Sequence, residues 1–222
     1  LEIDPDKIAL CIERGVNVIE QNLDLGLGNF ASNSFDVVVM TQSLQALHYP
    51  DKVLAEMLRV DHAGEFAAVH IYRAQRAVLE GRKGKDAIAA DLTEMEGHEA
   101  VHLARFETLL NENRVRPTAM IPLWKLAATA LGAGTALISE KAAHACTEAV
   151  ESVIEKHYAD QIEEIRDRDP ELAAELTKFR EEELAHHDHA IEHGSREAPA
   201  YRLLSSVIKV GCKAAIKISE RI

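Results

Sequence analysis

The sequence predicts an all-α helical bundle preceded by a short, incomplete α/β fragment. After residue 60 no run has the alternating pattern of a β-strand, and long helical patterns follow one another. The chain has 222 residues, of which 47% are hydrophobic but only 5% are aromatic. It is rich in Ala, Leu, Glu and Lys, which favour helices. This length suffices for one large domain.

Turn residues define the ends of the predicted helices. GRKGK at 81–85 separates the first two, and Asp169-Pro170-Glu171 supplies an N-cap, a first-turn proline and an early acid. The expected helices cover residues 61–80, 86–112, 122–138, 140–166, 171–193 and 201–220.

The first sixty residues have a different pattern. Short β-like runs occur at 17–21 (NVIEQ) and 35–40 (FDVVVM), with turn-rich residues between them. Residues 50–60 then have a helical pattern. We therefore expect a separate segment over 1–59 and a helical domain over 60–222.

Charge and cysteine content restrict the class of protein. The net charge of −12 argues against nucleic acid as a partner. Cys11, Cys146 and Cys212 are far apart and odd in number, which indicates free thiols in a reducing compartment. The sequence shows no secretory signal.

One short motif occurs twice. Glu99-Ala-Val-His102 and Glu183-Leu-Ala-His186 both spell E-x-x-H on predicted helices. Residues three positions apart share one face of a helix, so each pair can present two ligands in one direction.

Each E-x-x-H helix follows a helix that carries one candidate glutamate, Glu65 or Glu151. Counted from the turns near residues 83 and 168, all candidate ligands lie about 15 to 19 residues away, or roughly 25 Å along the helix. Two such hairpins would bring four glutamates and two histidines to one point. This is the ligand set of a carboxylate-bridged di-iron site in a ferritin-like bundle, and it suits iron or manganese.

Two alternatives compete with this interpretation. Residues 98–102 spell H-E-x-x-H, the zinc protease signature, in which His98 and His102 would bind zinc and Glu99 would be the general base. That reading leaves the second E-x-x-H unexplained and lacks an obvious third zinc ligand. A non-catalytic alternative is a ferritin-like iron-storage bundle that uses the same ligands.

Several longer segments carry a family resemblance. They are LRVDHAGEFAAVHIYRAQ, RPTAMIPLWKLAATALGAGTAL, ACTEAVESVIEKHYADQI, FREEELAHHDHAIEHG and APAYRLLSSVIKVGCKAAIKISERI. From about 58 to 222 the sequence resembles the demethoxyubiquinone hydroxylases of ubiquinone biosynthesis. The resemblance implies a ferritin-like four-helix bundle and adds His157 and Tyr158 as a His-Tyr pair near the iron. The metal ligands that it implies are Glu65, Glu99, His102, Glu151, Glu183 and His186.

The reaction implied by the resemblance is an O2-dependent ring hydroxylation. The substrate would be a 2-polyprenyl-3-methyl-6-methoxy-1,4-benzoquinone or quinol, before the last O-methylation. Two iron ions per chain are expected, bridged by Glu99 and Glu183, with Glu65 and Glu151 as terminal ligands. The resemblance implies NADH as the electron source, although residues 61–222 contain no glycine-rich nucleotide motif. Other ubiquinone-biosynthesis proteins are expected as partners.

Two helices are expected at a membrane surface, where a polyprenyl quinone resides. In the last helix Lys209, Lys213, Lys217 and Arg221 form a basic stripe. Its expected apolar stripe consists of Leu204, Val207, Ile208, Gly211, Ala215, Ile218 and Ile222. The alternative is an ordinary packing helix.

Residues 119–138 are mostly apolar, but Lys125, Pro122 and two glycines interrupt them. We therefore expect a membrane-dipping helix anchored by Trp124 rather than a spanning one. The expected location is peripheral, on the cytoplasmic side of the cell membrane. In a eukaryote it would be the matrix side of the mitochondrial inner membrane.

Residues 1–59 resemble the middle of a class I S-adenosylmethionine-dependent methyltransferase of the MetW type. LEID would be the strand whose acid holds the ribose, and FDVVVM would be the fourth strand. The glycine-rich loop and the last strands of that fold are absent. We therefore expect a truncated fragment that neither binds S-adenosylmethionine nor has methyltransferase activity.

Overall fold

The computed structural model describes residues 5–15 and 50–221. The chain divides into two compact units, residues 1–52 and 53–222. In the first unit, the described residues include the short helix α1 (Pro5–Glu13). The LEID segment and the strands expected at 17–21 and 35–40 lie outside the described residues. No strand occurs within the described ranges.

Six long helices follow, and their bounds agree closely with the expected ranges. They are α2 (Pro50–Leu79), α3 (Asp86–Glu112), α4 (Ile121–Ile138), α5 (Glu140–Ile165), α6 (Pro170–Glu192) and α7 (Tyr201–Ser219). The one difference is that the helical segments expected at 50–60 and 61–80 form a single helix. Neither proline nor glycine interrupts residues 51–63, so α2 passes through the boundary expected between residues 59 and 60.

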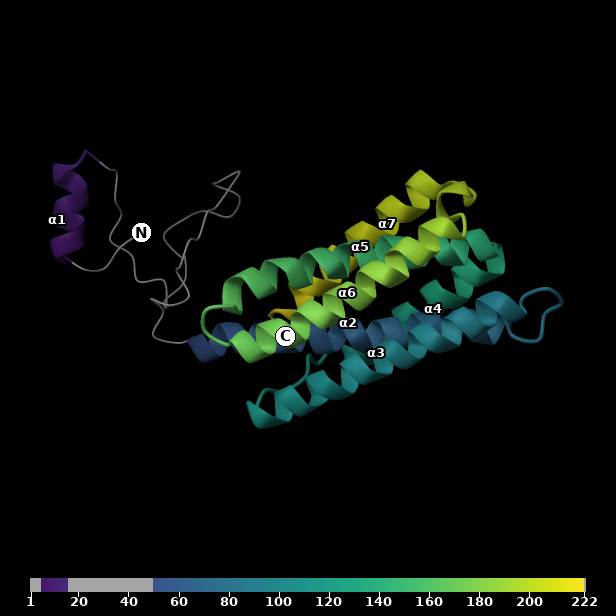
Figure 1. Cartoon of the computed structure of the whole chain (residues 1–222), viewed down its shortest axis with the longest axis horizontal. Coiled ribbons are helices and arrows are strands. Elements are labelled where there is room, and N and C mark those ends of the chain that lie inside the picture. Colours follow the sequence, from purple (N-terminus) through teal and green to yellow (C-terminus); the bar gives the residue numbers. More distant parts are fainter. Residues whose placement is uncertain (1–4, 16–49, 222) are drawn as a thin grey trace. The chain divides into compact units, whose positions relative to one another are not determined.

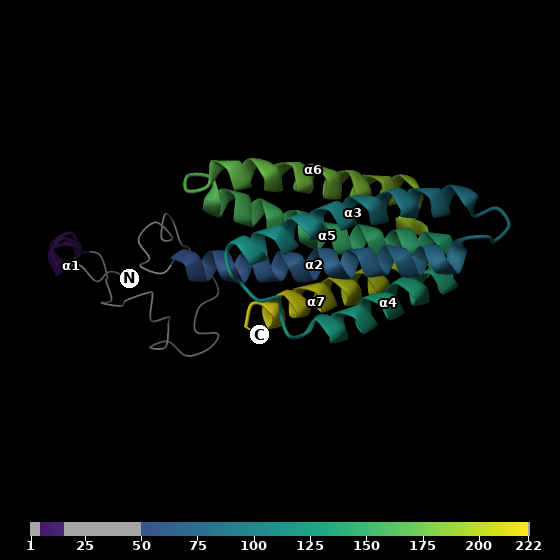
Figure 2. The same cartoon turned by 90° about the horizontal axis from the view of Figure 1, so that it is seen from below.

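The helices α2, α3, α5 and α6 form an antiparallel bundle made of two hairpins (Figures 1 and 2). The first hairpin joins α2 to α3 through a turn in which Gly81 and Gly84 have φ angles of 74° and 77°. These left-handed conformations suit glycine and end α2. The second hairpin joins α5 to α6, and α4, which connects the two hairpins in the chain, runs along the outside of the bundle next to α7 (Figure 2).

Side chains cap both helices of the second hairpin, and the cap at Asp169 is the one that the sequence predicts. Asp169 accepts a hydrogen bond of 2.9 Å from the backbone N–H of Leu172, and Pro170 stands in the first turn of α6. Ser139 accepts a 3.0 Å bond from the N–H of Ala142 and begins α5. These caps fix where both helices start.

The helices α4 and α7 pack beside the bundle. A Cβ atom at Gly132 of α4 would lie 2.3 Å from the backbone oxygen of Ile71 in α2, so only glycine allows this close approach. Trp124 at the start of α4 donates its indole N–H to Ser219 Oγ at the end of α7, at 3.0 Å. Its expected role as a membrane anchor stays a prediction. By length and composition alone, α4 is apolar enough to cross a membrane.

The apolar surface of α7 differs from the expected stripe. Ile208 is buried and Leu204 packs against core clusters, so part of that stripe contacts the bundle. Leu203, Val207 and Val210 form the exposed apolar row. One apolar face of α7 therefore packs against the bundle and another is exposed, and contact of this helix with a membrane stays a prediction.

A candidate metal centre inside the bundle

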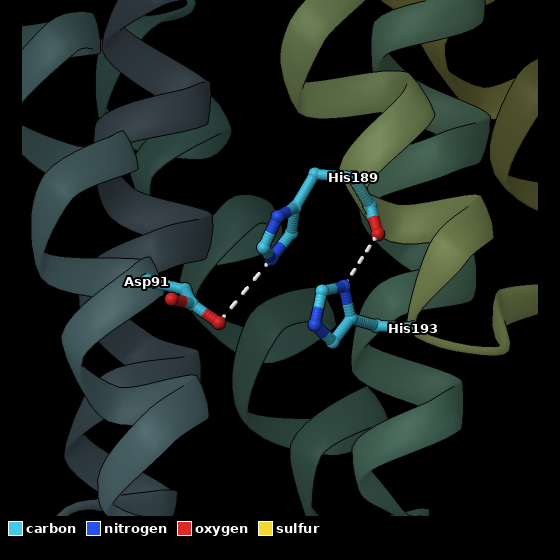
Figure 3. Close-up of side chains that lie close together, drawn as sticks. All are labelled: Asp91, His189 and His193. Atoms are coloured by element: carbon cyan, nitrogen blue, oxygen red, sulfur yellow. Dashed lines mark hydrogen bonds and ion pairs between the residues drawn. The ribbon is translucent and has the colours of Figure 1, made fainter.

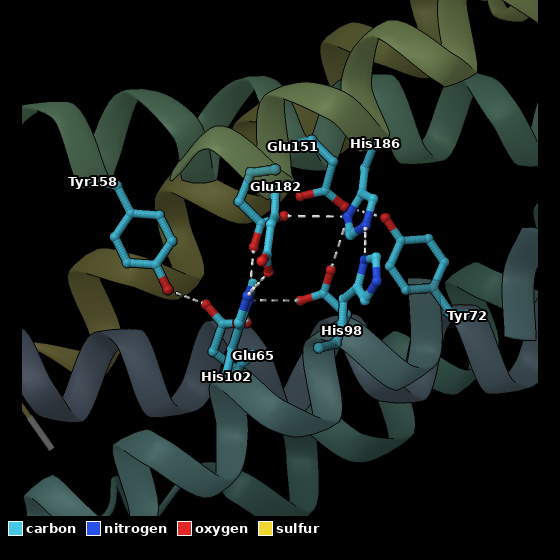
Figure 4. A network of polar contacts seen from close by, with 10 residues as sticks. Glu65, Tyr72, His98, His102, Glu151, Tyr158, Glu182 and His186 are labelled. Atoms are coloured by element: carbon cyan, nitrogen blue, oxygen red, sulfur yellow. Dashed lines mark hydrogen bonds and ion pairs between the residues drawn. The ribbon is translucent and has the colours of Figure 1, made fainter. Parts of the chain in front are cut away.

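The structure brings the four predicted glutamates and two histidines together inside the bundle (Figure 4). They form two groups, and in each the potential ligand atoms lie within 4.8 Å of one another. One group contains Glu65, Glu99, His102 and Glu183, and the other contains Glu99, Glu151, Glu183 and His186. Glu99 and Glu183 belong to both groups, which is the position required of carboxylates that bridge two ions.

Both histidines turn Nδ1 toward the carboxylates. His102 Nδ1 lies 3.1 Å from Glu183 Oε1 and 3.4 Å from Glu65 Oε2. His186 Nδ1 lies 3.2 Å from Glu99 Oε1. Ligands bound at about 2.1 Å to one ion lie about 3 Å apart, so these spacings match a shared metal.

The donor set fits a pair of cations. Each of the six residues has at least one buried oxygen or nitrogen without a hydrogen-bond partner. Buried polar atoms normally have partners, and buried charges are paired or coordinate metals. Four carboxylates and two neutral imidazoles carry a charge that two divalent cations would balance. Oxygen-rich ligation with imidazole suits iron or manganese.

Burial and mutual repulsion set the protonation of the metal-free site. Burial, followed by the charge of Glu183, raises the pKa of Glu99 and of Glu151 well above the usual range. Burial lowers the pKa of His102, but its contacts with Glu183 and Glu65 outweigh this and raise the pKa to about 11. The site therefore retains protons that a metal ion must displace.

Two tyrosines hold the outer glutamates in a crossed arrangement. Tyr158 of α5 donates its hydroxyl hydrogen to Glu65 Oε1 of α2, and Tyr72 of α2 donates to Glu151 Oε1 of α5 (Figure 4). Burial, and then the adjacent glutamate, raises the pKa of both tyrosines well above the usual range. Both hydroxyls therefore remain donors.

Sequence reasoning missed Tyr72, although a signal was present. Tyr72 follows Glu65 by seven residues, and Tyr158 follows Glu151 by the same interval. Seven residues make about two helical turns, so each tyrosine shares a helix face with its glutamate. The repeated spacing could have identified the pair.

The outward nitrogens of the two histidines also have neighbours (Figure 4). His102 Nε2 lies 2.6 Å from Glu182 Oε2, and His186 Nε2 lies 3.0 Å from His98 Nδ1. Such outer partners fix the orientation of a ligand histidine. His98 belongs to neither group of ligand atoms, so the pairing of His98 with His102 that the zinc protease signature requires is not formed.

His157 lies outside the cluster. Its Nε2 is 3.3 Å from Asp61 Oδ1 and 3.0 Å from Gln161 Nε2. Burial lowers the pKa of His157, but the contact with Asp61 outweighs this, so the pKa is raised. Of the predicted His-Tyr pair, only Tyr158 contacts a proposed ligand.

An apolar cavity of about 410 Å³ lies between α2, α4, α5 and α7. Small residues of α2, including Gly64, Ala67 and Ala68, form one wall of the cavity. They precede and follow Glu65 in the sequence. Val150, next to Glu151, and Val153 belong to the α5 wall. Apolar ligands therefore have a space beside the helices that carry the cluster.

The fold and the cluster define a ferritin-like helical bundle with a buried carboxylate–histidine site. A comparison with known families gives the more specific assignment. The model of the family described as "Ubiquinone biosynthesis protein COQ7" matches residues 52–219, and the chain belongs to this family.

Individual relatives carry hydroxylase names. A "3-demethoxyubiquinol 3-hydroxylase" of Rhodospirillum rubrum is 47% identical over 173 residues, covering 78% of this chain and 80% of the relative. The mouse "NADPH-dependent 3-demethoxyubiquinone 3-hydroxylase, mitochondrial" is 47% identical over 169 residues, with 74% and 76% covered. A yeast "5-demethoxyubiquinone hydroxylase, mitochondrial" is 40% identical over 188 residues, with 76% and 78% covered.

A second family model matches the N-terminal part of the chain. It is described as "Methionine biosynthesis protein MetW" and covers residues 1–79. The two matches overlap over residues 52–79, within α2. The expected resemblance of the first residues to this family is therefore confirmed.

Proposed function

We propose that this chain is an O2-dependent monooxygenase that hydroxylates the ring of 3-demethoxyubiquinol or its quinone. The observation that carries the proposal is the buried cluster with two shared glutamates and unpartnered ligand atoms. Membership of the family supplies the class of substrate.

The cluster is proposed to hold two iron ions. Glu99 and Glu183 would bridge them, as the sequence predicts. Glu65 and His102 would complete one iron site, and Glu151 and His186 the other. When bound, the iron pair supplies the redox chemistry that activates O2.

The tyrosines restrict how the outer glutamates bind. Tyr158 occupies Glu65 Oε1, while Glu65 Oε2 is buried, lacks a partner and faces His102. Glu151 has the same arrangement, with Oε1 bound by Tyr72 and Oε2 unpartnered. Each outer glutamate therefore offers one oxygen to a metal. Binding through one oxygen would leave open a coordination position that a carboxylate bound through both oxygens would fill.

The cavity walls orient the substrate and exclude water. Its lining is largely apolar, which suits a quinone ring with a prenyl tail. Exclusion of water by these side chains would also limit side reactions with solvent.

Hydroxylation puts one oxygen atom on the ring and the other in water, and it consumes two electrons and two protons. His157 is a candidate proton donor, because its pKa is raised and its side chain is partly exposed. His157 precedes Tyr158 on α5 and contacts Asp61, so it would supply a proton by way of Asp61. It would not bind a metal ion.

A reduced nicotinamide cofactor is the proposed electron source. The sequence resemblance implied NADH, whereas the mouse relative is named NADPH-dependent. Comparing the rates of iron reduction by NADH and NADPH in the iron-loaded protein would distinguish these two donors.

The substrate is proposed to enter from a membrane surface. Exposed apolar side chains occur on two of the four helices that border the cavity: Leu123 and Leu126 on α4, and Leu203, Val207 and Val210 on α7. Lys213 and Lys217 of α7 are exposed and would contact anionic lipid headgroups. Peripheral attachment fits the cytoplasmic side of a bacterial membrane, or the matrix side of the mitochondrial inner membrane in a eukaryote.

The proposal is tested by a single turnover. Anaerobically reduced, iron-loaded protein is mixed with a short-chain demethoxyubiquinol and ¹⁸O₂, and the product is analysed by mass spectrometry. One ¹⁸O atom in the ring is expected, and Glu183→Ala should give no product. Release of oxidised iron without hydroxylated quinol would instead favour the storage function.

A further inference from the structure

A second cluster of candidate metal ligands lies between α3 and α6. Asp91 of α3, His189 of α6 and His193, which directly follows α6, each offer one ligand atom, and these atoms lie within 4.8 Å of one another (Figure 3). His189 Nε2 is 3.2 Å from Asp91 Oδ2. None of the three belongs to the central cluster, and all are at least partly exposed.

The orientation of His193 suits a metal ligand. Its Nδ1 lies 2.9 Å from the backbone oxygen of His189, which can only accept a hydrogen bond (Figure 3). Nδ1 therefore carries the proton, and Nε2 keeps its lone pair. Metal-binding histidines are commonly oriented by such a bond to a backbone carbonyl. The spacing of four residues places both histidines on the same side of the C-terminal end of α6.

A buried histidine adjoins this cluster. His144 of α5 is 4% exposed, and its Nε2 has no hydrogen-bond partner. Its ring centre is 5.4 Å from that of His193 and 6.0 Å from that of His189. Nothing in the central cluster explains this buried and unpartnered nitrogen.

The donor chemistry differs from that of the central cluster. Two histidines and one carboxylate, with a third histidine beside them, form an imidazole-rich set, whereas the central cluster is dominated by carboxylates. Imidazole-rich sites favour zinc and the later first-row divalent ions. Three protein ligands with further positions open to solvent are a common arrangement for zinc.

We propose that Asp91, His189 and His193 form a further metal site, separate from the central cluster, that binds one zinc-like divalent ion beside the buried His144. The site is reached from solvent, because Asp91 and His189 also line a cavity of about 190 Å³ between α3 and α6. The same cavity is lined by His98, Glu182 and His186. A bound ion would therefore lie beside the outer partners of the central cluster.

The test uses the full chain without a histidine tag, loaded with iron and kept anaerobic. Zinc is titrated calorimetrically, and Co²⁺ is added in parallel to observe its visible absorption. We expect one further ion per chain with no loss of iron. The double variant His189→Asn/His193→Asn should lose this binding, and Asp91→Asn should weaken it. His187→Asn, on the same helix and outside the cluster, is the matched control.

Two results would overturn the proposal. One is zinc binding that persists unchanged in the double variant. The other is zinc binding that occurs only as iron leaves, because the ion would then occupy the central cluster. His193 is exposed, so His193→Asn alone gives a folded variant for a repeat titration. Both metals are counted directly, so the result does not depend on hydroxylase activity.

Discussion

Tyr158 of α5 donates a hydrogen bond across the bundle to Glu65 of α2, and so fixes one oxygen of a proposed metal ligand. Loss of this donor should leave a buried carboxylate oxygen unsatisfied. We expect Tyr158→Phe to retain two irons per chain but to lower single-turnover hydroxylation by about 10- to 100-fold, as for other outer partners of metal ligands. Tyr72→Phe is the matched variant on the other side and should have a similar effect. Full activity in both variants would show that the tyrosines are not needed for positioning.

The ligand assignment predicts a contrast between neighbouring residues. His102→Ala and Glu183→Ala remove ligand atoms of the cluster, so both should lose iron. His98→Ala removes a contact with His186 Nε2 but no ligand atom, so it should retain two irons. Metal analysis of the purified proteins checks this. Equal iron loss in His98→Ala would contradict the proposed ligand set.

The stability of the metal-free protein should fall as pH rises. Glu99 and Glu151 have raised pKa values in the fold, so the folded protein holds more protons than the unfolded chain above their ordinary range. For His102 the pKa rises from 6.5 to about 11, so its stabilising contribution is complete below 6.5 and is lost as pH rises through 11. Urea denaturation from about pH 6.5 to 9 should therefore give a decreasing free energy of unfolding.

Iron should flatten this pH dependence, because it replaces the retained protons. The double variant Glu99→Gln/Glu151→Gln should also have a smaller slope in its metal-free form, since the amides do not ionise. A metal-free stability that increases with pH over this range would refute the predicted protonation.

The apolar cavity should control access of the quinone. Ala67 lines it, so Ala67→Phe should fill part of the 410 Å³ space and raise the KM for demethoxyubiquinol while iron content stays at two. Ala130→Phe makes the same change at an exposed position of α4 that does not line the cavity. Both are compared in steady-state assays with quinols of increasing tail length. Equal KM values for the two variants would place the substrate elsewhere.

The basic residues of α7 should support membrane attachment. Replacing Lys209, Lys213 and Lys217 with glutamate should release the protein from anionic liposomes, since each basic residue contributes on the order of 1 kcal/mol. The control replaces Lys83, Lys156 and Lys178, which are exposed on other elements, with glutamate. Cosedimentation measures the bound fraction. Equal binding of the two triple variants would exclude α7 as the contact.

Local signals made the helices and the grouping of the central glutamates and histidines predictable. Asp169 and the glycines at 81 and 84 define turns, and a fixed rise per residue places ligands at one level once the turns are known. Contacts between helices that are distant in the sequence were harder to predict. The bond from Tyr72 to Glu151 and the approach of His189 to Asp91 depend on how two helices rotate about their axes. The exposed apolar row on α7 differs from the expected stripe for the same reason, because the helices packed against α7 determine which of its apolar side chains are buried.

The equal spacing of ligands and tyrosines in the two hairpins has a further consequence. Each hairpin supplies one lone glutamate, a tyrosine seven residues later and one E-x-x-H pair. Each ligand group consists of three residues from one hairpin and one glutamate from the other. Two identical hairpins related by a two-fold axis would supply the same set. The chain thus has the architecture of a tandem duplication of a homodimer-forming unit. In that arrangement α4 is the covalent link between the two halves, so their sequences need not be identical.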